Sequence, residues 1–329
     1  MAGRPEKDDA PQGAERDNAE EPRHSGYVAI VGHTNVGKST LLNRLVGEKI
    51  AIVSGAPQTT RTRIMGILTL PAGQIVFLDT PGFHKPQHRL NRAMIETATA
   101  AMQGVDVLLW VVDAKVGFGP GDTKVGAIIA QRRRAGTPLF VVLSKVDLVA
   151  KPKLLPLIER AVRDFGASEV YPVSAVEGDN IEVLTQGILR ALPPGPPLFP
   201  EDTLTDQPER DLTAEFIREK ILHHTKEEIP HATAVVLERW EDGDDGITRI
   251  DAAILVEREG QKGIVIGKGG EMLKRVGTEA RKDIERLLGR QVGLRLWVKV
   301  REHWRDDART LRSLGITGAG GEGAGGPEF

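Results

Sequence analysis

Short apolar runs alternate with amphipathic stretches over the first half of the chain. Residues 27–32, YVAIVG, form a β-branched run that ends in glycine, which is typical of a buried strand. Leucines at helical spacing follow residue 38. Further buried strands are predicted over 64–70, 74–80, 106–114, 138–147 and 169–175, and helices near 90–103, 121–135, 152–165 and 180–191. This order predicts an α/β domain with a mostly parallel sheet and helices on both faces. No helix separates 64–70 from 74–80, so one strand is expected to be antiparallel.

The pattern changes after PPGPPLFP, which cannot continue a helix and predicts a linker over 193–204. A helix is predicted over 210–224. Strands over 232–240 and 247–257 flank EDGDDG, a hairpin turn signal. Two helices surround GKGG at 267–270, and a last strand is predicted over 292–300. The order α-β-β-α-α-β predicts a small α+β domain.

The two ends of the chain have little capacity to bury apolar area. Residues 1–25 are polar and mostly acidic, and residues 317–329 are rich in glycine, so we expect a disordered tail and a flexible tail there. Between them we expect the α/β domain over 26–192 and the α+β domain over 205–316.

Composition excludes several classes of protein. Hydrophobic residues make up 40% and charged residues 27%, as in ordinary globular chains. The absence of cysteine excludes disulfides and thiol metal sites and fits a reducing cytosol. No apolar run approaches the roughly 20 residues of a spanning helix, so any membrane contact is expected to be peripheral.

Charge is distributed unevenly over the second domain. Residues 205–257 carry 6 basic and 14 acidic side chains, whereas residues 258–312 carry 15 basic and 8 acidic ones. A late basic segment is the electrostatic footprint expected for a phosphate backbone. A solvated helix face is the alternative explanation.

The strongest chemical signal is GHTNVGKS at residues 32–39, which matches GxxxxGK[ST] between a predicted strand and a predicted helix. Backbone N–H groups of such a loop surround phosphates. Lys38 would meet the β- and γ-phosphates, and the Ser39 hydroxyl would ligate Mg²⁺. The predicted nucleotide contacts from this loop are Gly32, His33, Thr34, Asn35, Val36, Gly37, Lys38, Ser39 and Thr40.

Companion strings follow at predicted strand ends, where open α/β sheets bind ligands. The first is Asp79, Thr80, Pro81 and Gly82: Asp79 would hold Mg²⁺ through its shell, and the Gly82 amide would meet the γ-phosphate. The second is Ser144, Lys145, Val146 and Asp147. The third contains Ser174 and Ala175, which could offer a backbone N–H to guanine O6.

Base identity is expected to be read by Asp147. Its carboxylate could accept hydrogen bonds from guanine N1–H and the N2 amine, a donor pair that adenine lacks. Ser144 departs from the usual GTPase pattern, which has Asn there. Because serine is shorter and makes fewer hydrogen bonds, we expect weaker nucleotide binding than with Asn.

The segment SGAPQTTRTR at 54–63 could supply a further Mg²⁺ ligand. Either Thr60 or Thr59 could reach the ion, and resemblance to related switch segments favours Thr60; a plain polar loop is the alternative. Phe83 stands where many Ras-like proteins have a water-orienting Gln. Asn35 resembles the K⁺-ligating Asn of cation-dependent GTPases, so K⁺ is one candidate aid to hydrolysis; a loop-stabilising role is the alternative. Lys38, Thr60, Gly82 and Asn35 are therefore the predicted catalytic residues.

The GKGG string predicts single-stranded nucleic-acid binding. Gly267, Lys268, Gly269 and Gly270 match the GxxG loop of a KH domain, which clamps a nucleic-acid backbone. The bare tetrapeptide is weak evidence, but an apolar run precedes it, a basic helix follows, and the element order is that of a type II KH domain. Further predicted RNA contacts are Lys274, Arg275, Arg281 and Lys282.

Taken together, the segments resemble one family. VGHTNVGKSTLLNRLVG, APQTTRTRIMGI, DTPGFHKP, SKVD, PVSA, AEFIREKIL, VEREGQKGIVIGKGG and LRLWVKVREHWR, within residues 26–316, are similar to the bacterial-type Era GTPases. The resemblance implies a P-loop GTPase domain joined to a type II KH domain, with GTP and GDP as ligands and Mg²⁺ as cofactor. It further implies binding of the 3′ end of 16S ribosomal RNA, assistance in 30S subunit assembly, and a cytoplasmic monomer with peripheral membrane contact. The rival hypothesis is a signalling or membrane-associated GTPase whose KH-like module contacts proteins instead of RNA.

Overall fold

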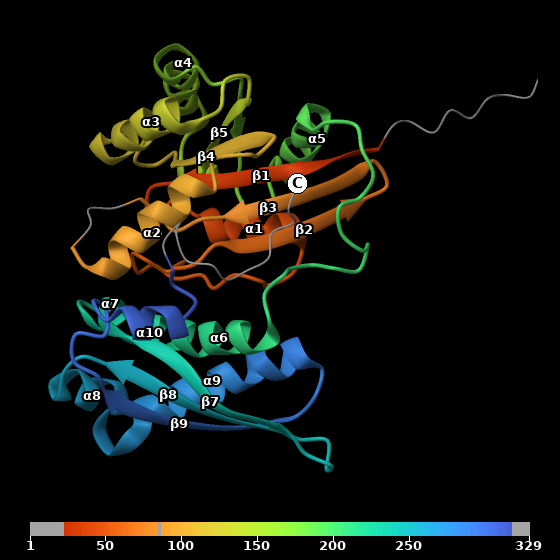
Figure 1. Cartoon of the computed structure of the whole chain (residues 1–329). Coiled ribbons are helices and arrows are strands. Elements are labelled where there is room, and N and C mark those ends of the chain that lie inside the picture. The colour runs from red at the N-terminus through yellow and green to blue at the C-terminus, as the bar shows by residue number, and fades with distance from the viewer. Residues whose placement is uncertain (1–22, 84–86, 318–329) are drawn as a thin grey trace, which may run out of the picture.

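The computed structural model describes residues 23–83 and 87–317 of the 329-residue chain. The chain forms two modules, each built on its own sheet (Figure 1). The first module contains a six-stranded sheet in the order β2-β3-β1-β4-β5-β6. Its strands are β1 (His24–Gly32), β2 (Ile64–Leu70), β3 (Gly73–Asp79), β4 (Val107–Asp113), β5 (Leu139–Ser144) and β6 (Glu169–Pro172).

All neighbouring strands of this sheet are parallel except β2 and β3, which pair antiparallel. The prediction of a mostly parallel sheet with one antiparallel strand is therefore confirmed. Strand β1 lies in the middle, between β3 and β4, and its residues Val28–Val31 are fully buried. Its carboxyl end, Gly32, therefore lies between the ends of β3 and β4, and the loop at residues 32–39 begins there.

Helices cover both faces of this sheet, as predicted. They are α1 (Lys38–Val46), α2 (Arg89–Ala100), α3 (Pro120–Arg132), α4 (Leu154–Phe165) and α5 (Ile181–Ala191). One apolar cluster contains Leu41 of α1 and Leu184 of α5. The other contains Ala98 of α2, Val125 of α3 and Ala161 of α4. The sheet thus has two separate cores, with α1 and α5 on one face and α2, α3 and α4 on the other.

The first strand begins earlier than the sequence indicated. We expected order from residue 27, but β1 begins at His24. The His24 N–H donates to Ala72 O at 3.0 Å and the Ser25 N–H to Pro193 O at 3.1 Å. These partners are distant in sequence, so local composition could not show them. The remainder of the predicted N-terminal tail (residues 1–22) and most of the C-terminal one (318–329) lie outside the described residues.

The predicted linker is hydrogen-bonded to the first module. The side chain of Gln74, which is fully buried in β3, accepts from the Leu198 and Phe199 N–H groups at 2.8 and 2.9 Å. Its amide nitrogen donates to Phe199 O at 2.9 Å. Further along, the Ile67 N–H donates to Leu204 O at 2.8 Å. The connection therefore runs along β2 and β3 and fixes the point from which the second module starts.

The second module has the predicted α-β-β-α-α-β order of a type II KH domain. Its main elements are α6 (Glu209–His224), β7 (Ala234–Asp242), β8 (Thr248–Val256), α8 (Glu259–Ile266), α9 (Glu271–Leu288) and β9 (Val292–Val300). β7 and β8 pair antiparallel, and β8 and β9 pair parallel. The strand at 292–300 was predicted to the residue.

Short elements were not predicted. They are α7 (Ile229–Ala232), α10 (Ala308–Ser313) and the 3₁₀ turns η1 (Val146–Leu148), η2 (Lys151–Lys153) and η3 (Lys268–Gly270). A helix of four to six residues shows too little of a 3.6-residue repeat to be recognised.

The two modules pack against each other. Ile52 of the first module belongs to the apolar cluster of the second, together with Phe216 and Ile221 of α6. A further cluster joins Leu90 and Met94 of α2 to Leu255, Trp304 and Leu311 of the second module. In Figure 1, α6 and α10 accordingly lie between the small sheet and the first module. The two modules therefore share apolar clusters and are packed together.

Candidate functional site

The phosphate loop joins β1 to α1 at the carboxyl edge of the sheet. Gly32 ends β1, and a Cβ on it would lie 2.4 Å from Val111 O, so no side chain fits there. Gly37 precedes α1 with φ 95°, a left-handed conformation that glycine adopts without strain. The loop therefore turns at glycines, where no side chain blocks the backbone, and α1 begins directly after it. This is the arrangement that binds phosphate at a helix N-terminus.

Lys38 is the first residue of α1 and is buried. Its ammonium donates to His33 O at 2.9 Å and to Gly32 O at 3.4 Å. Burial lowers the pKa of Lys38 to about 8, and the nearby Asp79 carboxylate partly offsets this effect. The side chain is thus held inside the loop, in a position to meet phosphate oxygens.

Three side chains predicted to act together at Mg²⁺ do meet in the structure. Ser39 Oγ donates to Asp79 Oδ2 at 2.7 Å and lies 2.8 Å from Thr60 Oγ1. Thr60 Oγ1 also lies 3.4 Å from Asp79 Oδ2. Of the two threonines considered, Thr60 is the one at this point. Thr59 instead bonds Ala56 O and the Ser54 hydroxyl.

The residues around Asp79 fit a magnesium ion. Asp79 is fully buried, and its Oδ1 has no hydrogen-bond partner among the described residues. Burial raises the pKa of Asp79, while Lys38 and the Ser39 hydroxyl lower it. An unpaired buried carboxylate oxygen beside two hydroxyls is an all-oxygen donor set, which suits Mg²⁺ completed by phosphates and water. Among the described residues no group of three or more His, Asp or Glu side chains could hold a metal ion.

The string after Asp79 approaches the phosphate loop closely. Thr80 donates its hydroxyl to Ile30 O at 2.8 Å, and a Cβ on Gly82 would lie 2.8 Å from Thr34 Cα. Only glycine at 82 allows this approach. Phe83 is buried in the core beneath, and its N–H donates to Gly32 O at 3.2 Å. Its ring therefore serves packing. The His-Lys-Pro that follows, at 84–86, lies outside the described residues.

The base-binding end is built by the turn after β5. Lys145 has φ 57° and donates its ammonium to Asn35 O at 2.7 Å and to Asp113 Oδ2 at 2.7 Å. This contact holds the turn against the phosphate loop. Asp147 follows on η1 with its side chain exposed, free to accept from a base. Asp113, at the end of β4, was not among the predicted residues, although its place at a strand end was a usable signal.

Ser144 makes more contacts than its length suggested. Its hydroxyl lies 2.7 Å from Val36 O and 3.1 Å from Val112 O, and the side chain is buried. It therefore already ties β5 to the phosphate loop, which is the task expected of Asn. Whether nucleotide binding is weaker than with Asn stays a prediction.

The last predicted base contact is divided between two residues. The Ser174 N–H donates to Asp179 O at 3.2 Å, and the Ser174 hydroxyl accepts from the Glu177 N–H at 3.2 Å. Ser174 thus shapes the loop. In the part of the chain that the structure describes, the Ala175 N–H has no backbone acceptor, so Ala175 is the better candidate for guanine O6.

A second concave surface lies in the other module, beside the GKGG turn. A groove of about 990 Å³ runs between α9 and β9 and is lined by Gly270, Lys274 and Arg281, all predicted RNA contacts. Arg239, Arg249 and Arg295 also line it and were missed by sequence reasoning. They lie singly on strands, so no charge run marked them.

The remaining predicted RNA residues stand beside this groove and not in its lining. Gly267 ends α8, and a Cβ there would lie 2.6 Å from Met272 Cβ. Lys268 and Gly269 form the exposed tip of the turn. Arg275 and Lys282 are exposed on α9, next to Lys274 and Arg281 in sequence.

Comparison with known proteins agrees with this two-site arrangement. A family model described as a 50S ribosome-binding GTPase matches residues 27–145, and a KH domain model matches residues 228–305. GTPase Era of Lacticaseibacillus paracasei is 50% identical over 292 residues, covering 89% of this chain and 96% of its own length. GTPase Era of Heliobacterium modesticaldum is 47% identical over 296 residues, covering 90% and 98%.

The chain belongs to the Era GTPase family. A crystal structure of Era in complex with MgGDPNP and nucleotides 1506–1542 of 16S ribosomal RNA has a TM-score of 0.86 and 41% identity, covering 89% of this chain and 99% of its own. A variant of Aquifex aeolicus Era bound to GDP and AlF4⁻ has a TM-score of 0.85 and 42% identity, with the same coverage. This Era family member is a GTPase with a KH domain.

Membrane association was expected to be peripheral if present. No helix within residues 23–83 and 87–317 combines the length and the apolar character needed to cross a membrane.

The lowered pKa of Lys38 predicts proton uptake on nucleotide binding. At pH 8.5 a group with a pKa of about 8 is largely neutral in the free protein, and phosphates would favour its charged form and raise that pKa. Calorimetry of GDP binding in two buffers of different ionisation enthalpy should show uptake at about pH 8.5 and little at about pH 7. Lys38→Arg, which is charged throughout, should abolish the uptake; equal uptake in both variants would contradict the assignment.

Asp147 is predicted to select guanine. Asp147→Asn should weaken GTP and GDP binding and admit xanthosine nucleotides, because the amide then offers a donor to the xanthine oxygen. Fluorescence titration with GDP, XDP and ADP measures this. Asp164→Asn is a control that should leave all three unchanged, because Asp164 is exposed near the end of α4 and Asp147 lies on η1. Unaltered GDP affinity in Asp147→Asn would show that another residue reads the base.

Proposed function

We propose that this Era family GTPase is a nucleotide-controlled switch that binds the 3′ end of 16S ribosomal RNA through its KH module and assists 30S subunit assembly. The observation that carries the proposal is the state of the cations at the GKGG turn and along α9. Among the described residues, Lys268, Lys274, Arg275 and Lys282 form no ion pair. Unpaired cations beside a groove suit a polyphosphate ligand.

The groove of about 990 Å³ also has lining residues that suit a nucleic acid. Lys274 and Arg281 of α9 line it together with Arg295 of β9. Glycines at the turn allow a nucleic-acid backbone to approach closely, as in other KH domains. The Era structure determined with nucleotides 1506–1542 of 16S ribosomal RNA supports the same ligand for this chain. A protein-binding KH-like module, the rival hypothesis, has no need of unpaired cations around glycines.

The nucleotide site supports GTP hydrolysis with Mg²⁺, and the Era structure with MgGDPNP supports the same cofactor. We propose that Ser39 and Thr60 hold Mg²⁺ directly and Asp79 holds it through its shell. Lys38 and the amides of the loop and of Gly82 would stabilise charge on the β- and γ-phosphates, which is the main source of catalysis in phosphoryl transfer. Mg²⁺ supplies charge neutralisation between the two phosphates.

Asn35 is the proposed ligand for a monovalent cation. Its side-chain amide donates to Gly55 O at 2.8 Å, so the segment after α1 is already tied to the phosphate loop here. The Asn35 side chain is thus in contact with Gly55 O at the loop. K⁺ bound by the Asn35 side-chain oxygen would stabilise the negative charge that develops on the phosphates during hydrolysis. Phe83 cannot assist the reaction by orienting the attacking water.

The proposed division of the chain remains a GTPase module over 26–192 and a KH module over 205–316, acting as a monomer.

The RNA hypothesis predicts that changes at the tip of the turn abolish RNA binding and spare GTP hydrolysis. A Cβ on Gly269 meets nothing within 4 Å, and asparagine or aspartate tolerates its φ of 61°, so Gly269→Asp should fold. The Lys268→Asp and Gly269→Asp double variant adds bulk and negative charge where the backbone must approach. Gel shifts with the 3′-terminal RNA across a KCl series should show lost binding, and the wild type should lose affinity with a slope of about −0.7 per phosphate contact.

Lys226→Asp is the matched control for charge, because Lys226 is exposed in the same module and away from the groove. It should bind RNA like the wild type. If the double variant also binds normally, RNA is held elsewhere and the protein-contact hypothesis gains.

The monovalent cation hypothesis predicts faster GTP hydrolysis in KCl than in NaCl at equal ionic strength. The advantage should disappear in Asn35→Ala, which removes the proposed ligand oxygen. Single-turnover hydrolysis with saturating protein measures both. Identical wild-type rates in the two salts would exclude the ion and leave a residue supplied by a partner.

A further inference from the structure

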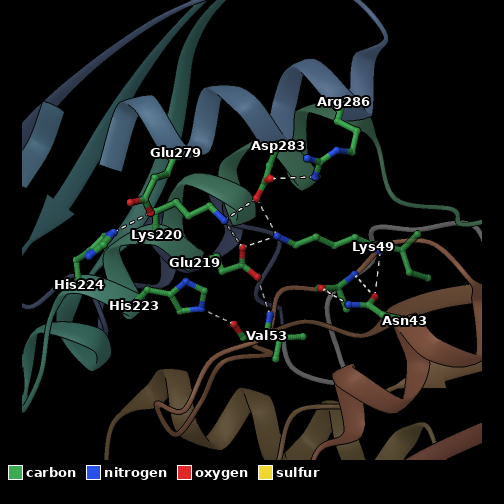
Figure 2. Close-up of polar contacts among 12 residues, drawn as sticks. Asn43, Lys49, Val53, Glu219, Lys220, His223, His224, Glu279, Asp283 and Arg286 are labelled. Carbon is green, nitrogen blue, oxygen red and sulfur yellow. Dashed lines mark hydrogen bonds and ion pairs between the residues drawn. The ribbon is translucent and has the colours of Figure 1, made fainter. Parts of the chain in front are cut away.

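The segment that carries Thr60 runs directly against helix α6 of the KH module. Near its start, both polar groups of Val53 are bound from α6 (Figure 2). The Val53 N–H donates to Glu219 Oε1 at 2.9 Å, and Val53 O accepts from His223 Nε2 at 2.8 Å. Glu219 and His223 are four residues apart on α6, so they share one face of the helix. One face of the KH module thus fixes the backbone at this end.

A third residue of α6 reaches the other end of the segment. Arg218 donates from Nη2 to Thr59 O, the carbonyl of the peptide that enters Thr60. The Arg218 side chain is 1% exposed, and Nε donates to Glu215 Oε1 at 2.8 Å. Its guanidinium is therefore held in place by its own helix while it binds the segment.

The side chain of the residue after Thr60 is buried against another part of the KH module. Arg61 is 5% exposed and donates from Nη1 to Thr233 O at 2.7 Å and from Nη2 to Pro230 O at 3.1 Å. Its guanidinium also lies 5.5 Å from the Trp304 ring centroid. Thr60 therefore stands between two residues that are both fixed to the KH module.

We propose that Arg218 is a positioning residue for GTP hydrolysis: from the KH module it holds the Thr59–Thr60 peptide so that the Thr60 hydroxyl reaches the Mg²⁺ site. This inference rests on the proposed role of Thr60 at Mg²⁺. The Thr60 hydroxyl lies beside Ser39 Oγ and Asp79 in this arrangement, within one residue of the Arg218 contact. Arg61 fixes the chain immediately after Thr60.

A purely structural role for these arginines is poorly supported by their surroundings. Burial and the charges of Arg218 and Arg305 lower the pKa of Arg61, and Glu215 is the charge that offsets them. Arg61 Nε and Arg218 Nη1 are buried without a hydrogen-bond partner among the described residues. A buried ion pair such as Arg218–Glu215 is weak evidence for a role in stability. Their hydrogen bonds to main-chain carbonyls instead fix the course of the backbone.

The test uses Arg218→Gln in the full-length protein. The variant should bind GDP with Mg²⁺ as the wild type does, because Thr60 is needed only when the γ-phosphate is present. Binding of a non-hydrolysable GTP analogue with Mg²⁺ and single-turnover hydrolysis should each fall about tenfold or more, as expected for a lost hydrogen bond to a charged group. Arg218→Lys, which can still donate to Thr59 O, should restore part of the loss.

Arg210→Gln is the matched control. Arg210 lies on the same helix but is exposed and contacts Trp240, so the substitution should leave both nucleotides unaffected. Thermal unfolding and RNA gel shifts of each variant report whether the KH module stays folded, independently of the nucleotide measurements. If Arg218→Gln does not fold, His223→Ala replaces it. His223 is exposed, and its substitution removes the donor to Val53 O at the other end of the same segment.

Combination with Thr60→Ala distinguishes positioning from general damage. If Arg218 acts through Thr60, the double variant hydrolyses GTP no more slowly than Thr60→Ala alone. Additive losses, or equal losses of GDP and GTP-analogue affinity, would overturn the inference. Either result would leave the RNA-binding proposal intact, because that depends on the GKGG variants.

Discussion

The molecule depends on one buried carboxylate. Asp79 ends β3 with no exposure to solvent, one oxygen held by Ser39 and the other without a partner among the described residues. A carboxylate in this state is costly unless a cation completes it. Because Ser39 comes from the phosphate loop and Thr60 from the segment after α1, completing the site draws these two parts of the chain onto the sheet edge. A contact that shifts Thr60 therefore also changes the group of oxygens around Asp79.

The KH module is placed to act on Thr60, and its helices extend the connection. Lys49, which precedes Val53, pairs with Glu219 of α6 at 2.5 Å and with Asp283 of α9 at 2.9 Å, and Lys220 joins the same two carboxylates (Figure 2). α9 also lines the groove proposed to bind RNA. These ion pairs therefore connect that helix to the segment that carries Thr60, and a measured coupling energy would test whether a change at the groove reaches Thr60.

Sequence reasoning recovered the framework and the ligand-binding strings for a shared physical reason. β2 is an apolar run, β9 alternates apolar residues with Arg295 and Lys299, and the phosphate loop is a backbone conformation that only certain residues permit, so each is encoded locally. The contacts of Arg218 and Arg61 across the two modules are not encoded locally in this way. Arg61 lies in a polar stretch and Arg218 in a helix with many charges, and nothing along the chain distinguishes a buried arginine from a solvated one. Their partners are carbonyl groups more than 150 residues away.

The charge split of the KH module also needs the fold for its interpretation. Four cations of the basic half pair with acids of the acidic half: Arg290 with Asp242, Arg295 with Asp251, Lys299 with Glu238 and Arg305 with Glu257. Folding therefore neutralises much of the apparent basic stripe inside the module. Among the described residues of the basic half, the cations without an ion pair are Arg258, Lys268, Lys274, Arg275, Lys282, Arg309 and Arg312. Of these, Lys268, Lys274 and Arg275 lie at the GKGG turn or in the first turns of α9. The positive charge available to RNA is thus smaller than the sequence count suggests, and the part that lies at the turn stands beside a groove and glycines that admit a nucleic-acid backbone.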